Sequence, residues 1–267
     1  MIDILKKQLS KDMSDEEKLN RAREFLQIVC LKIMYDKGVF NNMAFVGGTA
    51  LRILFDLRRF SEDIDFSVID NKGYDFTKIN NELIRELRLY GFKAESDPRV
   101  DKNVDSTFLK FSGFLKELGL SPMESQKLSI KVEVDTNPPK GGNVVSTLVN
   151  KTYVLNISHF DLSSMFATKL HACFYRNYLK GRDFYDFIWY LGRKTKPNFL
   201  LLNNAIKQTQ GTDPHISEQN LKDFLLQNIE KVDLKLAQKD VERFLEDKSE
   251  LKLFDRGAIT NTIASIY

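Results

Sequence analysis

The fold of this chain is decided by two neighbouring blocks of sequence, Phe45-Val46-Gly47-Gly48-Thr49-Ala50-Leu51-Arg52 and Arg59-Phe60-Ser61-Glu62-Asp63-Ile64-Asp65-Phe66. The apolar run from Met43 to Val46 predicts a short strand that ends at the glycine pair, and a helical pattern follows from Thr49 to Phe55. Glycines at a strand-to-helix turn let the backbone approach a phosphate closely, and the amides at the start of a helix favour its negative charge. The first block therefore predicts a phosphate-binding turn.

The second block predicts a pair of metal ligands on a strand. Asp63 and Asp65 alternate with Ile64 and Phe66, so both carboxylates face one way and the apolar pair faces the core. Two like charges side by side are costly without a cation, and hard oxygen ligands suit Mg²⁺. Two such ions about 4 Å apart would hold the attacking and leaving oxygens of a phosphoryl or nucleotidyl transfer. Each block taken alone is more often a simple turn or a solvated strand edge.

A later part of the chain predicts another half-apolar strand. Between Gln126 and Thr136, apolar residues alternate with the charged residues Lys131, Glu133 and Asp135. This strand could supply a third metal carboxylate. The alternative is that both acids line a solvated face of the sheet.

A third block lies in the helix-rich part that begins near Phe160. It reads Lys169-Leu170-His171-Ala172, then Arg176, then Gly181-Arg182-Asp183-Phe184-Tyr185-Asp186. Lys169 stands in an apolar stripe, from which a lysine either extends its stem to solvent or holds an anionic ligand. Asp183 and Asp186 occupy neighbouring positions on one helix face, so the alternative for Arg182 and these two acids is a surface ion-pair network.

Together these blocks resemble the DNA polymerase beta-like nucleotidyltransferase superfamily, and more narrowly the AbiEii/AbiGii toxin family. The resemblance implies Asp63, Asp65 and Glu133 as ligands of Mg²⁺ (or Mn²⁺), although glutamate replaces the commoner aspartate at position 133, and Asp135 is the reserve candidate. It implies a nucleoside triphosphate (NTP) as substrate. The residues that it implies for nucleotide binding are Gly47, Gly48, Thr49, Ser61, Lys169 and Arg182, and Asp183 would complete the catalytic set.

The function implied by the resemblance is transfer of a nucleoside monophosphate to an acceptor, with release of pyrophosphate. The acceptor would be RNA, namely the 3′ end of a tRNA, and the protein would be a toxin that a neighbouring antitoxin restrains. Two alternatives stay open: a protein or small-molecule acceptor, and a catalytically silent nucleotide- or RNA-binding module. Basic residues from Lys180 to Lys196, with Tyr178, Tyr185, Trp189 and Tyr190 nearby, could contact RNA, although such aromatics more often belong to the core.

Composition and periodicity predict an α+β (mixed α/β) fold. With 42% hydrophobic residues and a net charge of +3, the 267-residue chain is expected to fold throughout and shows no strong basic bias. Residues 1–158 are expected to form a nucleotidyltransferase-fold domain, a small mixed sheet flanked by helices, and residues 159–267 a helical lobe that completes the active-site cleft. The helices expected are Asp15 to Asp36, Phe76 to Tyr90, Asn198 to Lys207, Ser217 to Glu230 and Leu234 to Leu245.

The predicted compartment is the cytoplasm. Cys30 and Cys173 both lie in apolar helical patterns, so we expect reduced thiols and no disulfide. The charged N-terminal region does not resemble a signal peptide, and no apolar run reaches the roughly 18 residues of a membrane span.

Overall fold

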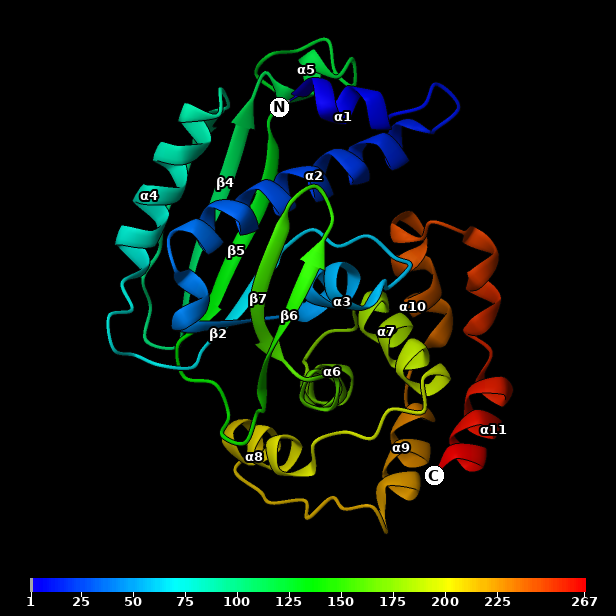
Figure 1. The fold of residues 1–267 in the computed structure, drawn as a ribbon. Helices are drawn as coiled ribbons and strands as arrows, with labels where there is room; N and C mark the ends of the chain where they lie inside the picture. The colour runs from blue at the N-terminus through cyan, green and yellow to red at the C-terminus, as the bar shows by residue number, and fades with distance from the viewer. Residues whose placement is uncertain (1) are drawn as a thin grey trace. The chain divides into compact units, whose positions relative to one another are not determined.

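The computed structural model of the protein describes residues 2–267. The chain forms two compact units, and each of them draws on distant parts of the sequence (Figure 1). Unit 1 comprises the residues up to Asp56, Phe60–Asn137 and Ser146–His159; unit 2 comprises Leu57–Arg59, Pro138–Val145 and Phe160–Tyr267. Unit 1 carries the glycine turn and the acidic strands, whereas unit 2 carries the block from Lys169 to Asp186.

Unit 1 is built on a mixed sheet. Over the described residues the strand order is β3-β4-β5-β2-β1-β7-β6. The strands are β1 Met43–Val46, β2 Ile64–Val68, β3 Lys93–Glu95, β4 Val104–Ser112, β5 Leu128–Asp135, β6 Val144–Asn150 and β7 Val154–Phe160. β2 pairs antiparallel with β1 and parallel with β5, and β1 pairs parallel with β7. The acidic strand β2 therefore lies in the middle of the sheet.

Helices cover the sheet of unit 1. They are α1 Ile2–Gln8, α2 Asp15–Asp36, η1 Val39–Asn41, α3 Gly47–Phe55, α4 Phe76–Leu89 and α5 Phe114–Glu117. α2 starts where the Ser14 hydroxyl accepts a hydrogen bond from the amide of Glu17. α4 starts where the Asp75 carboxylate accepts a hydrogen bond from the amide of Lys78. α2 and α4 pack against each other, α2 contacts β5, and α4 contacts β3 and β4 (Figure 1).

Unit 2 is helical. Its helices are α6 Leu162–Tyr175, α7 Gly181–Gly192, α8 Phe199–Gln210, α9 Leu221–Ile229, α10 Leu234–Val241, η2 Glu242–Phe244, η3 Lys248–Leu253 and α11 Arg256–Ile266. α6 and α7 pack through the stacked rings of Phe166 and Tyr190, whose centroids are 4.4 Å apart. α7 meets α10 closely, because a Cβ at Gly181 would lie only 1.9 Å from the carbonyl oxygen of Ala237.

The predicted fold class is confirmed, with a mixed sheet in the N-terminal part and helices after Phe160. The predicted strand Met43–Val46 and the helix ending at Asp36 have the observed limits. The helix predicted to reach Leu245 ends at Val241, because the chain tightens there into the 3-10 turn η2. Cys30 and Cys173 are free thiols, as predicted. The division after residue 158 stays a prediction about separate domains.

Within residues 2–267, no helix is both long and apolar enough to cross a bilayer.

Candidate active site

The glycine turn between β1 and α3 lies directly against an acidic side chain. Gly47 has a φ of +78°, in the left-handed region that glycine adopts readily. A Cβ added at Gly47 would lie 2.2 Å from Oδ2 of Asp65, so a side chain there would have to displace the Asp65 carboxylate. β1 and β2 create this proximity, because Val46 is in register with Asp65. Val46 gives α3 no side-chain cap, and a negative charge beside an uncapped helix start is favourable.

Thr49 holds Asp63, the residue just before β2. The side chain of Thr49 is completely buried, and its hydroxyl donates a hydrogen bond to the backbone carbonyl of Asp63. The side chain of Gln27, on α2, donates to the carbonyl of Ser61 at 3.1 Å. Ser61 is itself buried. Because the Thr49 hydroxyl is already used to hold the Asp63 carbonyl, the backbone amide of Thr49 is the group left to contact a triphosphate.

The turn before Ser61 is fixed by Arg52 of α3. Its guanidinium lies over the ring of Phe60, 4.0 Å from the centroid. The same guanidinium pairs with the carboxylate of Glu24 on α2, with Nη2 and Oε2 3.1 Å apart. A planar cation suits both contacts, since it can stack on a ring while its edge donates to a carboxylate. α2 and α3 thus jointly hold the segment that leads to the acids.

Asp65 and Glu133 lie side by side on β2 and β5. The two residues are in register in this parallel pair, and side chains in register on neighbouring strands point to the same face. Asp63, Asp65 and Glu133 are all half-buried. Asp135 is in register with Ser67, about 7 Å further along β5 than Glu133. Of the two candidates for a third acid, Glu133 is therefore the neighbour of Asp65.

Glu133 has a cationic partner on its own strand. Nζ of Lys131 lies 2.7 Å from Oε1 of Glu133. Asp135 accepts a hydrogen bond from the amide of Asn137 at 2.9 Å; burial raises the pKa of Asp135, and this amide partly offsets the rise. Within residues 2–267, no group of three or more His, Cys, Asp or Glu residues is arranged so that it could hold a metal ion.

Unit 2 contains a buried cluster of charges. Nζ of Lys169 lies 2.7 Å from Oδ1 of Asp183 and 2.8 Å from Oδ2 of Asp186. Arg59 clamps Asp186 with two hydrogen bonds of 2.6 Å, and Arg176 donates to Oδ2 of Asp183. The side chains of Arg59 and Asp186 are 2% and 0% exposed. The cluster ties the short segment at Arg59 to α6 and α7.

The opposite charges in this cluster stabilise one another's ionised forms. Burial lowers the pKa of Lys169, but the carboxylates of Asp183 and Asp186 outweigh that effect and raise it above its ordinary value. Burial raises the pKa of Asp183, but Lys169 and Arg176 outweigh that effect and lower it. Lys169 and Asp183 are therefore both charged at neutral pH. Removing one partner from such a cluster leaves an uncompensated buried charge.

Asp183 and Asp186 both contact the buried ammonium group of Lys169. The alternative of a surface network is wrong for these acids, because both are buried. Arg182 stacks on the ring of Phe244, with its guanidinium carbon 4.2 Å from the centroid. Arg59 was given no role from sequence, because its partner lies 127 residues away in the chain.

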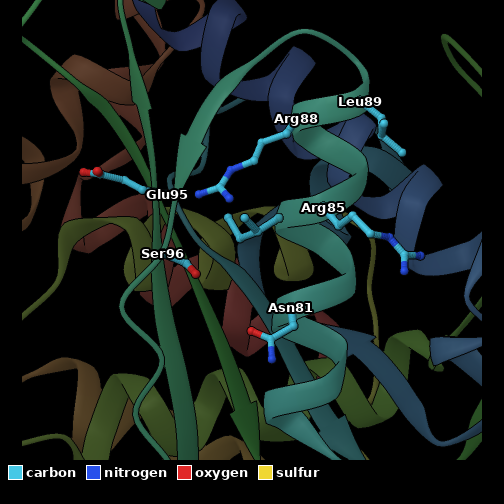
Figure 2. Close-up of a pocket in the computed structure, with 7 residues that line it drawn as sticks. Asn81, Arg85, Arg88, Leu89, Glu95 and Ser96 are labelled. Atoms are coloured by element: carbon cyan, nitrogen blue, oxygen red, sulfur yellow. The ribbon is translucent and has the colours of Figure 1, made fainter.

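A pocket of about 540 Å³ lies elsewhere in unit 1, between α4 and β3 (Figure 2). In Figure 2, Arg88 reaches towards β3, where its Nε donates to the carbonyl of Ala94 at 3.0 Å, and Arg85 points away from the strand. β4 and β5 separate β3 from β2. At about 4.8 Å per strand, β3 is roughly 14 Å from the acidic strand. The pocket is therefore distinct from the acidic site.

Comparison with known proteins identifies the family. The family described as "Nucleotidyl transferase AbiEii toxin, Type IV TA system" matches residues 31–257, a range that includes all three sequence blocks. A candidate nucleotidyltransferase from H. pylori is similar in structure, with a TM-score of 0.54, 19% identity, and coverage of 97% of this chain and 96% of that one. JHP933 from Helicobacter pylori gives a TM-score of 0.52, 19% identity, and coverage of 97% and 93%. At this identity the two structures show a shared fold.

No curated protein matches the chain. The family match, by contrast, covers most of the sequence, and it includes the glycine turn, both acidic strands and the Lys169 to Asp186 block. The chain therefore belongs to the AbiEii family of nucleotidyltransferase toxins of type IV toxin–antitoxin systems.

Proposed function

We propose that this protein is a metal-dependent nucleotidyltransferase that transfers a nucleoside monophosphate from an NTP to RNA. One observation carries the proposal: Asp65 lies against the glycine turn at the start of α3 and beside Glu133 on the next strand. A backbone suited to phosphate thus adjoins a pair of acids, which is the combination that transfer from a triphosphate requires. Membership of the AbiEii family supports the same class of activity.

Asp63, Asp65 and Glu133 are the residues that would hold Mg²⁺ or Mn²⁺. The chemistry of the three side chains suits these ions, which prefer carboxylate oxygens, but the three are not gathered around one point in residues 2–267, so binding would have to draw them together. A bound divalent cation supplies positive charge that stabilises the charge developing on the reacting phosphate. Glu133 would exchange its contact with Lys131 for the ion on binding.

The protein's own groups would bind the triphosphate and move one proton. The amides of Gly47, Gly48 and Thr49 at the uncapped start of α3 would donate to phosphate oxygens. The carboxylate of Glu133 would accept the proton of the acceptor hydroxyl as that hydroxyl attacks the α-phosphorus and pyrophosphate leaves. The roles of Ser61, Lys169, Asp183 and Arg182 at the nucleotide stay predictions from the family resemblance.

The acceptor in this proposal is RNA, and specifically the 3′ end of a tRNA. Modification there would block translation, which would account for a toxin, and the family's type IV toxin–antitoxin assignment supports an antitoxin partner. The competing candidates are a protein or small-molecule acceptor and a module that binds nucleotide without turnover.

Label transfer tests the proposal and names the acceptor. The purified protein is incubated with total bacterial RNA, Mg²⁺ and each α-labelled NTP in turn, with Asp63→Asn as the inactive control. Label on a tRNA-sized band with the wild-type protein alone is the expected result. Label on protein or small molecules would contradict the RNA acceptor, and no label with any NTP would contradict transfer itself.

A matched pair of variants tests the third acid in the same assay. Glu133→Gln should abolish transfer, because Glu133 is the neighbour of Asp65, whereas Asp135→Asn should retain it. The reverse result would transfer the role to Asp135.

A further inference from the structure

We propose that Tyr178 is a platform on which a base of single-stranded RNA stacks, flanked by Arg176 and Lys180. The site deepens the proposed function, on which it rests for its choice of RNA as the ligand. It lies in unit 2, in the chain between α6 and α7.

Burial separates Tyr178 from the other aromatics of this region. Tyr185 and Tyr190 are 4% and 0% exposed and belong to the core, where Tyr190 stacks on Phe166. Trp189 is half-buried and lies under the guanidinium of Arg193, 4.3 Å from the ring centroid. Tyr178 is 59% exposed. Of these four rings, it is the one that offers most of its surface to a ligand.

The segment that carries Tyr178 is fixed at both ends. Arg176 is held by its hydrogen bond to the buried carboxylate of Asp183. On the other side, the amide of Gly181 donates to Oδ2 of Asp240 at 2.7 Å. Since both anchors are in place before any ligand arrives, little ordering entropy is lost on binding.

Cations stand before and after the ring in the sequence and close to it in space. The guanidinium carbon of Arg176 and Nζ of Lys180 lie over the ring, 5.3 Å and 5.7 Å from its centroid, so a stacking base would displace a cation from the ring face towards the phosphates. An exposed aromatic between cations is the surface on which unpaired bases stack while phosphates are neutralised. A polynucleotide has a phosphate on each side of a base, which matches two flanking cations, whereas a mononucleotide carries its phosphates on one side. The geometry therefore favours single-stranded RNA.

Binding of a fluorescent single-stranded RNA of about 12 nucleotides, without NTP, tests the site directly by anisotropy. Because base stacking on an aromatic is lost in Tyr178→Ala, we expect the dissociation constant to rise about 5- to 150-fold. Tyr178→Phe keeps the stacking surface and should bind as the wild type does. Tyr35→Ala is the matched control, since Tyr35 is a 40% exposed tyrosine on α2, and it should leave RNA binding unchanged.

Lys180→Gln supplies a second, electrostatic test of the same site. Removal of one phosphate contact should reduce the slope of log K against log salt by about 0.7. RNA binding by Tyr178→Ala equal to that of the wild type would overturn the proposal. An equal loss of binding for RNA and for a lone NTP would also overturn it, because the ring would then serve the mononucleotide.

The test separates this site from the proposed activity. RNA binding that depends on Tyr178 in a protein that transfers no nucleotide would support the site and contradict the activity. Transfer by Tyr178→Ala with an unchanged KM for RNA would contradict the site and leave the activity intact. A raised KM for RNA, with an unchanged KM for NTP, is the result that we expect.

Discussion

Replacing Gly47 by alanine tests the contact between the glycine turn and the Asp65 carboxylate. At the φ of +78° that Gly47 adopts, an L-residue costs about 1–2 kcal/mol. The new Cβ would also lie 2.2 Å from Oδ2 of Asp65, which forces that side chain out of its rotamer at about 0.5–1.5 kcal/mol more. We expect the free energy of unfolding to fall by about 1.5–3.5 kcal/mol. Displacement of Asp65 should also lower nucleotidyl transfer about 100-fold.

Gly73→Ala is the matched control for this substitution. Gly73 has a φ of +82°, and a Cβ added there would meet nothing within 4 Å. It should therefore lose the backbone contribution of about 1–2 kcal/mol alone and keep full activity. Urea unfolding measures stability, and transfer from a labelled NTP measures activity. If Gly47→Ala matches Gly73→Ala in both, the glycine turn does not press against Asp65.

Three further substitutions test buried polar contacts, two within unit 2 and one within unit 1. Asp186→Asn should lower the free energy of unfolding by about 3–5 kcal/mol, because it leaves buried Lys169 and Arg59 short of a counter-charge. The control is Glu124→Gln, which removes an exposed ion pair with Lys93 and should change the free energy of unfolding in urea far less. The pKa of Asp183 lies below its ordinary value in the folded protein, so the charged carboxylate stabilises the fold at any pH above the unfolded pKa of about 3.9. The difference in unfolding free energy between the wild type and Asp183→Asn should therefore be constant from about pH 6 to 8. It should shrink below about pH 4, as the carboxylate takes up a proton. Thr49→Val should cost about 1–3 kcal/mol, because the Asp63 carbonyl loses its buried donor, while Thr49→Ser should retain most of the stability; equal stability of the two variants would refute this role.

Much of the fold could be predicted because its central elements have strong local signals. The strand Met43–Val46 is wholly apolar and is stopped by glycines, and α2 has a clear cap at Ser14. Strand β3 was missed because Lys93-Ala94-Glu95 has one apolar residue, and it is a strand only through its pairing with β4. The hairpin of β6 and β7 was missed because no glycine or asparagine–glycine turn marks the loop between them.

The residues of the candidate active site could be predicted from the sequence more readily than the contacts between them. Alternation predicted a shared face for Asp63 and Asp65, although Asp63 lies just before β2; the pairing of Glu133 with Lys131 and the burial of the Thr49 hydroxyl depend on tertiary structure. The role of Arg59 could not be read locally, because the carboxylate that it clamps belongs to α7. The sequence likewise offered four aromatics for RNA, and only burial distinguishes Tyr178 among them.

A comparison of two labels tests whether the acids beside the glycine turn support transfer of a nucleotide. The protein is incubated with RNA and an NTP labelled at either the α- or the γ-phosphate, and Asp65→Asn serves as the control. Nucleotidyl transfer predicts α-label in the RNA, γ-label in pyrophosphate, and neither product with Asp65→Asn. Incorporation of γ-label into the acceptor, or unchanged α-label transfer by Asp65→Asn, would contradict nucleotidyl transfer at this site.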